Sequence, residues 1–421
     1  MRTIGNVLLV GLVACLLLGG CGKAEEKQVS FMVFGDTAEL AAYQALVDAF
    51  RAEHPNIEIE LRSVASQGDY QKQLVTAFSA GAEPDVMLLN HRRVAQFAAQ
   101  VGLEALGDRL VKSDTLDSAA FYSEALEAFE WDGQTWCIPQ NISSLVVYYN
   151  RDLFDAAGVA YPTEGWTWDG FVQAARALTL DLDGDGQADQ YGAGLDVGLM
   201  RLAPFVWQNG GELVDDVENP SRLALDSPEA LAAFQWFVDL QVKDHVVPDA
   251  TAEQAESSED RFMNGRLAMY FNSRRGVTTY RTVEGLNWDV APLPLGLQAA
   301  GILHSDGYCV SARTTDKESA WAFVEFANSV EGQTLMAGTG RTVPSLREVA
   351  ESAAFLDPSQ KPEHSQVFLD VIPVLRRMPN LAQWPAIEEA ANNEVERAFY
   401  GQATVEEAVS AAIASSQEFF K

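Results

Sequence analysis

The sequence predicts an α/β protein made of two lobes, and three observations lead to this prediction. The chain has 421 residues, which is longer than a single hydrophobic core usually supports. Strand-like and helix-like segments alternate between residues 29 and 90. An apolar run, Leu145–Tyr149, follows a loop that begins at Pro139, which lacks a backbone donor. A buried strand entered through such a loop can carry the chain from one lobe into the next.

The first elements predict a parallel sheet with helical crossovers. The apolar positions of residues 39–54 repeat at helical spacing, and the segment stops at His54-Pro55. Residues 57–61 alternate between apolar and acidic, as a half-exposed strand does. The predicted order is strand 29–34, helix 39–54, strand 57–61, helix 69–80 and strand 84–90.

Later elements show clear helix boundaries. Asn150 or Asp152 can cap a helix at Leu153–Ala157, and Gly158 can end it in the left-handed conformation. Thr167 can cap a helix that runs to Leu178. A proline in the first position opens the helix from 228 to about 242, and amphipathic helices close the chain.

The N-terminus has the layout of an export signal. One positive charge precedes an uncharged apolar run from Asn6 to Leu18, which is too short for a confident bilayer span. Leu18-Gly-Gly-Cys21 resembles a bacterial lipobox, so we expect residues 1–20 to be a signal peptide, Cys21 to be lipidated and 21–28 to be a tether. The alternative is an ordinary secretory signal. If Cys21 is lipidated, the mature protein sits in the cell envelope and is held to the membrane by lipid alone.

Composition narrows the functional classes. The formal net charge of −31 argues against nucleic acid or anionic lipid as a partner. The sequence contains no G-x-S-x-G, H-E-x-x-H, P-loop or dinucleotide glycine motif, so we do not expect an enzyme. A glycosidase-like carboxylate pair stays open because acidic residues are abundant. A structural or sensory lipoprotein is a further alternative.

Two cysteines remain after Cys15 leaves with the signal and Cys21 is acylated. These are Cys137 and Cys309, both in strand-like segments. We expect buried free thiols, because nothing in the sequence fixes their separation. A disulfide is the alternative, since an exported protein permits one.

An acidic loop at 181–189 is the sharpest chemical motif. Its spacing matches the first nine positions of a calcium loop, with Gly186 at the sharp turn. Position 12 is Gly192 rather than a bidentate glutamate, so a plain turn is the alternative. We expect no required cofactor and a possible structural calcium ion. The predicted ligands are Asp181, Asp183, Asp185, Asp189 and the backbone carbonyl of Gln187.

The segment Trp136–Gly158 also carries a family resemblance, through its "P…YYNRDLF…AG" pattern. Together with Glu83–Asn90, Trp207–Leu213 and Asp260–Arg274, it resembles the extracellular solute-binding proteins of ABC importers, in the family that includes maltose-binding protein. The resemblance implies a type II periplasmic-binding-protein-like fold, with two α/β lobes joined by a multi-crossing hinge. It implies a first lobe of 29–140 plus 291–327 and a second lobe of 141–290 plus 328–421.

The implied function is capture of a sugar or oligosaccharide between the lobes and its delivery to an ABC permease by a monomeric lipoprotein. Ligands of open α/β sheets bind beyond the carboxyl ends of strands, and aromatic faces can stack on sugar rings. Because several arginines fall on cleft-lining segments, an anionic solute such as a uronate or a glycerophosphoester is an alternative. The predicted ligand-binding residues are Asp36, Thr37, Asn90, Arg92, Ser143, Trp207, Asn209, Ser273, Arg274, Arg341 and Trp384.

Overall fold

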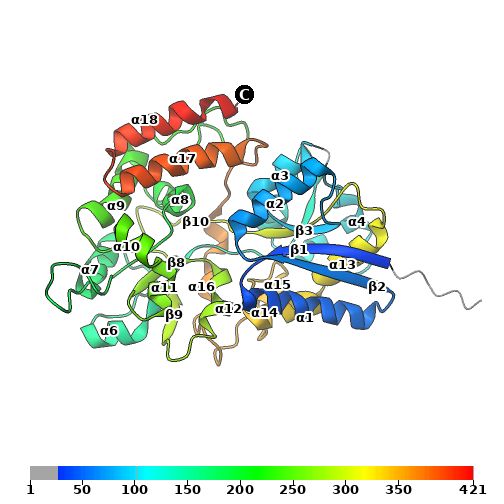
Figure 1. Ribbon diagram of the computed structural model, residues 1–421, viewed down its shortest axis with the longest axis horizontal. Coiled ribbons are helices and arrows are strands. Elements are labelled where there is room, and N and C mark those ends of the chain that lie inside the picture. Colours follow the sequence, from blue (N-terminus) through cyan, green and yellow to red (C-terminus); the bar gives the residue numbers. More distant parts are fainter. Residues whose placement is uncertain (1–26, 101, 421) are drawn as a thin grey trace, which may run out of the picture.

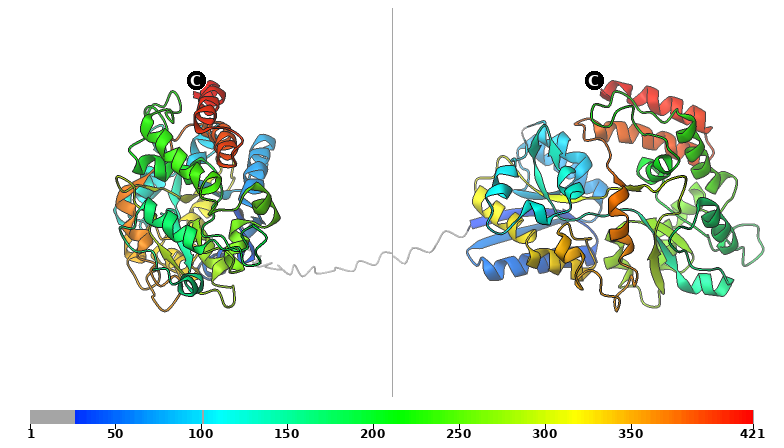
Figure 2. Two further views of the ribbon diagram at one scale, coloured as in Figure 1. Left: turned by 90° about the vertical axis from the view of Figure 1, so that its left-hand side faces the viewer. Right: turned by 180° about the vertical axis from the view of Figure 1, so that it is seen from behind.

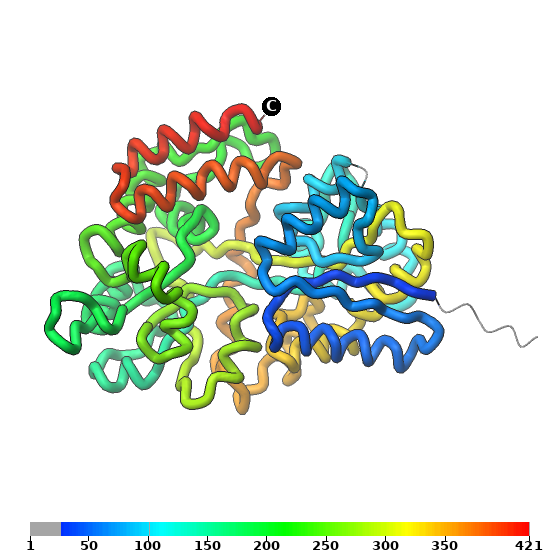
Figure 3. The backbone as a smooth tube through the Cα atoms, viewed as in Figure 1, coloured from blue at the N-terminus to red at the C-terminus, as the bar shows by residue number. Residues whose placement is uncertain are grey.

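A computed structural model describes residues 27–100 and 102–420 (Figure 1). The chain forms two lobes, with the N-terminal strands in one and the C-terminal helices in the other (Figure 1, Figure 3). The predicted signal peptide, Cys21 and most of the predicted tether lie outside the described residues. Within the described ranges, no helix is both long enough and apolar enough to cross a membrane.

The first lobe is built on a five-stranded sheet in the order β2-β1-β3-β11-β6. The first three strands in sequence run parallel, whereas β11 is antiparallel to both of its neighbours. The predicted strand–helix alternation is therefore confirmed, and a returning strand completes the sheet. The strands are β1 Lys27–Phe34, β2 Ile57–Val64, β3 Val86–Asn90, β6 Cys137–Pro139 and β11 Asp306–Val310.

Helices flank this sheet (Figure 1). The first begins with a capping box, in which Asp36 accepts from the Glu39 amide and Glu39 accepts from the Asp36 amide. The second is capped by Ser66 at its start and by Gly81 at its end, where Gly81 has a positive φ of 66°. The first-lobe helices are α1 Thr37–Glu53, α2 Gln67–Ala80, α3 His91–Ala98, α4 Gly107–Lys112, α5 Ser123–Glu127 and α13 Lys317–Ala327.

The second lobe has a three-stranded antiparallel sheet in the order β8-β7-β9. Its central strand, β7 Val146–Asn150, is fully buried, as the apolar run predicted. β8 spans Met269–Asn272 and β9 spans Trp288–Ala291. The surrounding helices are α6 Arg151–Ala157, α7 Trp168–Leu178, α8 Leu199–Gln208, α9 Pro228–Val242, α10 Ala250–Ala255, α11 Ser258–Met263, α12 Val277–Tyr280, α17 Trp384–Phe399 and α18 Val405–Ser416.

Three connections join the lobes, at 140–145, 303–305 and 340–376. They lie side by side: Ser143 and His304 exchange backbone hydrogen bonds of 2.9 and 2.8 Å, and the Ile142 amide donates to the Val343 carbonyl at 3.0 Å. The third connection contains α15 Arg347–Ala350 and α16 Val367–Asp370 and rises between the lobes (orange in Figure 2). At its end, β12 Leu375–Arg376 pairs with β10 Gly301–Ile302.

The structure moves two of the expected lobe boundaries. Residues 292–300 were expected in the first lobe, but Leu295 donates to the Trp166 carbonyl and Gln298 donates to the Trp207 carbonyl, which holds this loop on the second lobe. Residues from 328 were expected in the second lobe, but α14 Val330–Thr339 packs against α1 and α13. The apolar side of α14 is thus part of the first lobe's core.

Cys137 and Cys309 form a disulfide, so the expectation of free thiols was wrong. The two residues are directly opposed in the register between β6 and β11, with their Cα atoms 4.4 Å apart. Directly opposed residues on one face of an antiparallel pair have the separation that a disulfide needs. The sequence alone does not show which residues of the two strands face each other, because Cys137 and Cys309 are 172 positions apart.

Candidate ligand-binding site

A polar cavity lies between the two lobes. Both lobes and the connections contribute to its wall, which contains four arginines and three carboxylates but only two phenyl-type rings. The lining residues are Phe34, Gln67, Asn90, Arg92, Asn141, Ser143, Asp196, Met200, Arg201, Glu259, Tyr270, Asn272, Ser273, Arg275, His304, Asp306 and Arg341.

The first-lobe wall is formed at the ends of neighbouring strands. Phe34 ends β1 and Asn90 ends β3, while Asp306 begins the antiparallel β11 and is therefore paired with Asn90 in the register. The Asn90 amide Nδ2 donates to Asp306 Oδ1 at 3.1 Å. Asn90 Oδ1 also accepts from the Arg92 amide and so caps α3. These polar groups gather where the carboxyl-end rule predicts them.

The second-lobe wall comes from β8, α11 and the start of α8. The Tyr270 hydroxyl donates to Asp196 at 3.2 Å. The hydroxyl of Tyr280, which lies behind the wall, donates to Glu259 Oε1 at 2.6 Å, and Asn272 Nδ2 donates to the same oxygen at 3.3 Å. Burial raises the pKa of Glu259 above its usual value despite these hydrogen bonds.

Every cavity-lining arginine pairs with a carboxylate. Arg92 on α3 pairs with Glu388 on α17, and Arg201 pairs with Asp196 at 2.7 Å. Arg275 and Arg341 share a single partner on α1, Glu39, at 3.5 and 3.0 Å. The pairs Arg92–Glu388 and Arg275–Glu39 connect the two lobes, so the same side chains face the cavity and hold the lobes together.

The cavity also presents buried polar atoms that have no hydrogen-bond partner among the described residues. These atoms include His304 Nε2, Arg201 Nε and Arg341 Nη2. Burial lowers the pKa of His304 well below its usual value, so its ring is neutral at pH 7. Burial alone would lower the pKa of Arg341 too, but the charges of Tyr43, Glu39 and Asp306 raise it. A leftover donor in a buried site is costly unless a ligand satisfies it.

Five of the eleven predicted binding residues line this cavity. Asn90 and Arg92 belong to the first lobe, Ser143 lies on the first connection, Ser273 follows β8, and Arg341 follows α14.

The other six lie elsewhere. Asp36 caps α1 and accepts from the Thr279 hydroxyl across the lobe boundary, while Thr37 is exposed as the first residue of α1. Asn209 donates to the Glu229 carbonyl. The two tryptophans expected to stack on a ligand, Trp207 and Trp384, are 2% and 0% exposed, because both pack into the core of the second lobe.

Arg274 is also displaced from the expected site. It is buried behind the cavity, where it donates to the Gly340 carbonyl and the Ser365 hydroxyl. Burial lowers its pKa to about 9. It therefore ties a second-lobe strand end to the third connection instead of meeting a ligand.

Sequence reasoning missed several lining residues. Asp306 could have been found by asking which strand returns beside Asn90, but that register is not a local signal. Asp196 and Arg201 flank the start of α8, and Glu259 lies on the short helix α11. No motif marks these three positions, because their chemistry appears only when distant segments meet.

The acidic loop brings together some, but not all, of the predicted calcium ligands. Carboxylate oxygens of Asp181, Asp183 and Asp189 lie within 4.8 Å of one another. Gly186 has a positive φ of 89°, as a sharp turn there requires. Asp185 is not part of this group, and its carboxylate accepts from the Gln187 amide at 2.7 Å. Three of the four predicted carboxylates thus converge.

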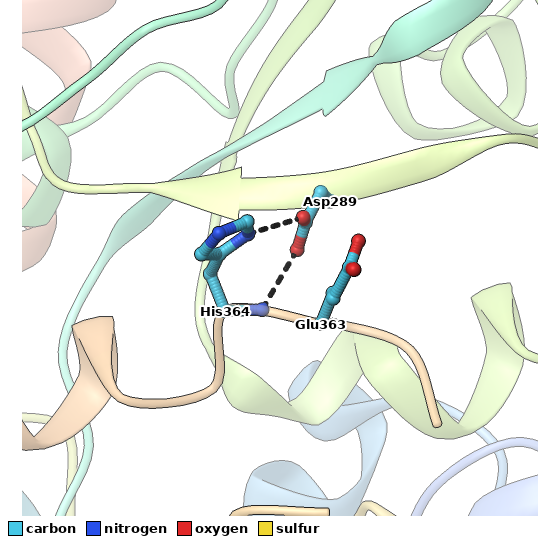
Figure 4. A group of neighbouring side chains, drawn as sticks. All are labelled: Asp289, Glu363 and His364. Carbon is cyan, nitrogen blue, oxygen red and sulfur yellow. Dashed lines mark hydrogen bonds and ion pairs between the residues drawn. The ribbon is translucent and has the colours of Figure 1, made fainter. Parts of the chain in front are cut away.

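A second group of possible metal ligands, Asp289, Glu363 and His364, lies where β9 meets the third connection (Figure 4). His364 contacts Asp289 through both Nδ1, at 2.6 Å, and its backbone amide, at 3.2 Å. Arg151 forms ion pairs with both Asp289 and Glu363. Because one guanidinium already forms ion pairs with both carboxylates, we interpret the group as a structural ion-pair cluster.

Comparison with known proteins agrees with this architecture. Residues 35–334 match the family described as bacterial extracellular solute-binding protein. The chain belongs to this family. A putative binding protein of Brucella abortus is 23% identical over 98% of both chains.

Among solved structures, an ABC substrate-binding protein of Listeria monocytogenes in complex with cycloalternan aligns with a TM-score of 0.86 and 25% identity, over 93% of this chain and 98% of that one. Maltose-bound T. maritima MalE3 aligns with a TM-score of 0.80 and 23% identity, over 94% of this chain and all of that one. The type II periplasmic-binding-protein fold is therefore confirmed.

Membership in this family makes the chain a solute-binding protein of an ABC transporter and not an enzyme, as the sequence predicted. The family is extracellular, which places the solute-binding protein outside the cytoplasm. The interlobe cavity brings together side chains from both lobes and from the connections between them.

Proposed function

We propose that this solute-binding protein captures a sugar or short oligosaccharide in the interlobe cavity and delivers it to an ABC permease. The observation that supports this most directly is the density of hydrogen-bonding groups from both lobes around one cavity. A polyhydroxylated solute can satisfy the unpartnered donors there. The Listeria neighbour is described in complex with cycloalternan and the T. maritima neighbour with bound maltose.

A thermal-shift screen of the purified protein over a sugar library tests this function. A true ligand at about a hundred times its Kd raises the unfolding free energy by about 2.7 kcal/mol and raises the Tm accordingly. Arg341→Met should abolish that shift for the same sugar, because Arg341 lines the cavity. A library in which no sugar changes the Tm would contradict the proposal.

The cavity gives less support to an anionic solute than the sequence did. All four arginines that line it have carboxylate partners. A uronate or glycerophosphoester would therefore compete with existing ion pairs. Calorimetry with glucuronate and glucose as a matched pair decides between these ligands, since preferential binding of glucuronate would restore the anionic alternative.

We also propose that Cys21 carries the lipid anchor and that the protein is a monomer. The lipobox-like sequence Leu18–Cys21 supports the anchor. Mass spectrometry of the wild-type protein and Cys21→Ser, expressed in a bacterium with lipoprotein processing, should show acyl chains only on the wild type. Sedimentation of the unlipidated variant should give the mass of one chain.

A structural calcium ion in the 181–189 loop remains a proposal, and the three converging carboxylates support it. Calcium should raise the Tm of the wild-type protein but not that of Asp183→Asn, and magnesium should have a smaller effect. Equal Tm values with calcium and with a chelator would assign the loop to a plain turn.

A further inference from the structure

More negatively charged than positively charged side chains surround the cavity. Four guanidinium groups face five carboxylates when the arginine partners behind the wall are included. Glu39, Asp196 and Glu388 are the partners of these four arginines. The remaining carboxylates, on Asp306 and Glu259, form no ion pair with the described residues. The site is therefore short of one cation.

Both remaining carboxylates keep one oxygen free. Asp306 Oδ1 accepts from Asn90, while its Oδ2 accepts from none of the described residues. Glu259 Oε1 accepts from Tyr280 and Asn272, while its Oε2 likewise accepts from none of them. Asp306 belongs to the first lobe and Glu259 to the second, so a ligand in the cavity has a free carboxylate oxygen on each side.

The nearby histidine does not supply the missing charge. His304 also lines the cavity, and burial lowers its pKa well below its usual value, so it stays neutral. Aromatic stacking cannot dominate recognition either, since the only phenyl-type rings in the lining, Phe34 and Tyr270, are 3% and 1% exposed. Specificity must therefore come from polar and charged groups.

We propose that the solute of this site carries a cationic amino group, as an amino sugar or an aminocyclitol does, and that its ammonium binds Asp306, with Glu259 as the second carboxylate. This inference rests on the proposed sugar-binding function and narrows its substrate class. An ammonium donates charge-assisted hydrogen bonds, and the free Oδ2 of Asp306 can accept one of them. A neutral sugar would leave the five carboxylates around the cavity with only four guanidinium groups as counter-charges.

The test is calorimetry of the purified protein with matched ligand pairs that differ only by an amino group in place of a hydroxyl. Suitable pairs are glucosamine with glucose, the glucosamine disaccharide with cellobiose, and an aminocyclitol with inositol. N-acetylglucosamine serves as a neutral form of the first amine. The amine of at least one pair should bind about tenfold to a hundredfold more tightly than its hydroxyl counterpart, as charge-assisted hydrogen bonds provide.

Two variants locate the effect. Asp306→Asn keeps an acceptor for Asn90 but removes the charge, and it should reduce amine affinity about tenfold or more while changing affinity for the hydroxyl counterpart by less than about threefold. Glu259→Gln should show the same pattern with a smaller loss. The matched control is Asp108→Asn, since Asp108 on α4 has a side chain that is 96% exposed.

The outcomes separate the two proposals. Equal or tighter binding of the hydroxyl members, or equal loss of both members in Asp306→Asn, would overturn the amine inference and leave the sugar-binding function intact. Failure of every sugar and every amine to bind the folded protein would contradict the proposed function itself. Circular dichroism and the Tm of each variant identify loss of folding as a separate cause.

Discussion

At the scale of single residues, Arg341 and Glu39 form the most buried ion pair of the site. Their side chains are 1% and 4% exposed, and the Arg341 guanidinium also lies 5.6 Å from the centre of the Tyr43 ring. Arg341→Met would leave the Glu39 carboxylate buried with only Arg275 as a partner. We expect the free energy of unfolding to fall by about 3–5 kcal/mol.

Urea denaturation measures this loss. Arg51→Met is the control, because Arg51 pairs with Glu58 on the surface and its loss should cost less than about 1 kcal/mol. Similar losses in the two variants would show that burial does not set the energy of the Arg341–Glu39 pair.

The buried carboxyl group of Glu259 leads to a prediction about how the stability of the folded protein depends on pH. Burial raises its pKa in the folded protein above the ordinary value of 4.5. Ionised Glu259 therefore destabilises the folded state, and the contribution of this residue to stability falls as the pH rises from about 4.5 through its folded pKa. Glu259→Gln keeps an acceptor for Tyr280 but has no charge to bury.

We therefore expect Glu259→Gln to match the wild type near pH 4 and to be more stable at pH 7, with the difference growing between these limits. Urea denaturation across this pH range provides the measurement. A difference that is largest at pH 4 and disappears at pH 7 would reverse the assigned sign.

At the scale of elements, the contact between α3 and α17 links the lobes through Arg92 and Glu388. The two side chains are 11% and 9% exposed, so their ion pair is largely removed from solvent. Glu388→Gln would weaken this link and shift the lobes toward an open arrangement. Small-angle X-ray scattering of the ligand-free variant should show a larger radius of gyration than that of the wild type.

Glu389→Gln is the matched control, since it removes one charge from the exposed neighbouring position on α17. The radius of gyration of this control should stay at the wild-type value. Identical scattering from all three proteins would show that the Arg92–Glu388 pair does not hold the lobes closed.

The elements were more predictable than the site. Helix 69–80 and the buried strand at 146–150 follow from local periodicity and caps, which act within a few residues. The ion pair between Arg92 and Glu388 joins residues 296 positions apart, which no local pattern shows. Trp207 and Trp384 were predicted to contact the ligand because aromatic faces stack on sugar rings. Both side chains are instead buried in the core of the second lobe.

At the scale of the whole molecule, the Cys137–Cys309 disulfide closes a loop of 172 residues that contains much of the second lobe. Such a cross-link restricts the unfolded chain, and the chain-entropy relation gives about 5 kcal/mol for this length. We expect reduction by dithiothreitol to lower the free energy of unfolding by up to that amount.

The double variant Cys137→Ala/Cys309→Ala should have a similarly reduced stability and should not respond to dithiothreitol. Mass spectrometry after alkylation should find these two thiols blocked in the native protein. Alkylation of both cysteines without a reducing agent would show that the bond is absent in solution.

The three neighbouring connections have a consequence for transport. Because hydrogen bonds join them into a narrow ribbon, the two halves can swing about one line but can hardly twist or slide past each other. We therefore expect rotation about that line to be the main motion between an empty and a filled shape. A permease that contacts one site on each lobe could therefore respond to the bound solute through the distance between these sites, without contacting the solute itself.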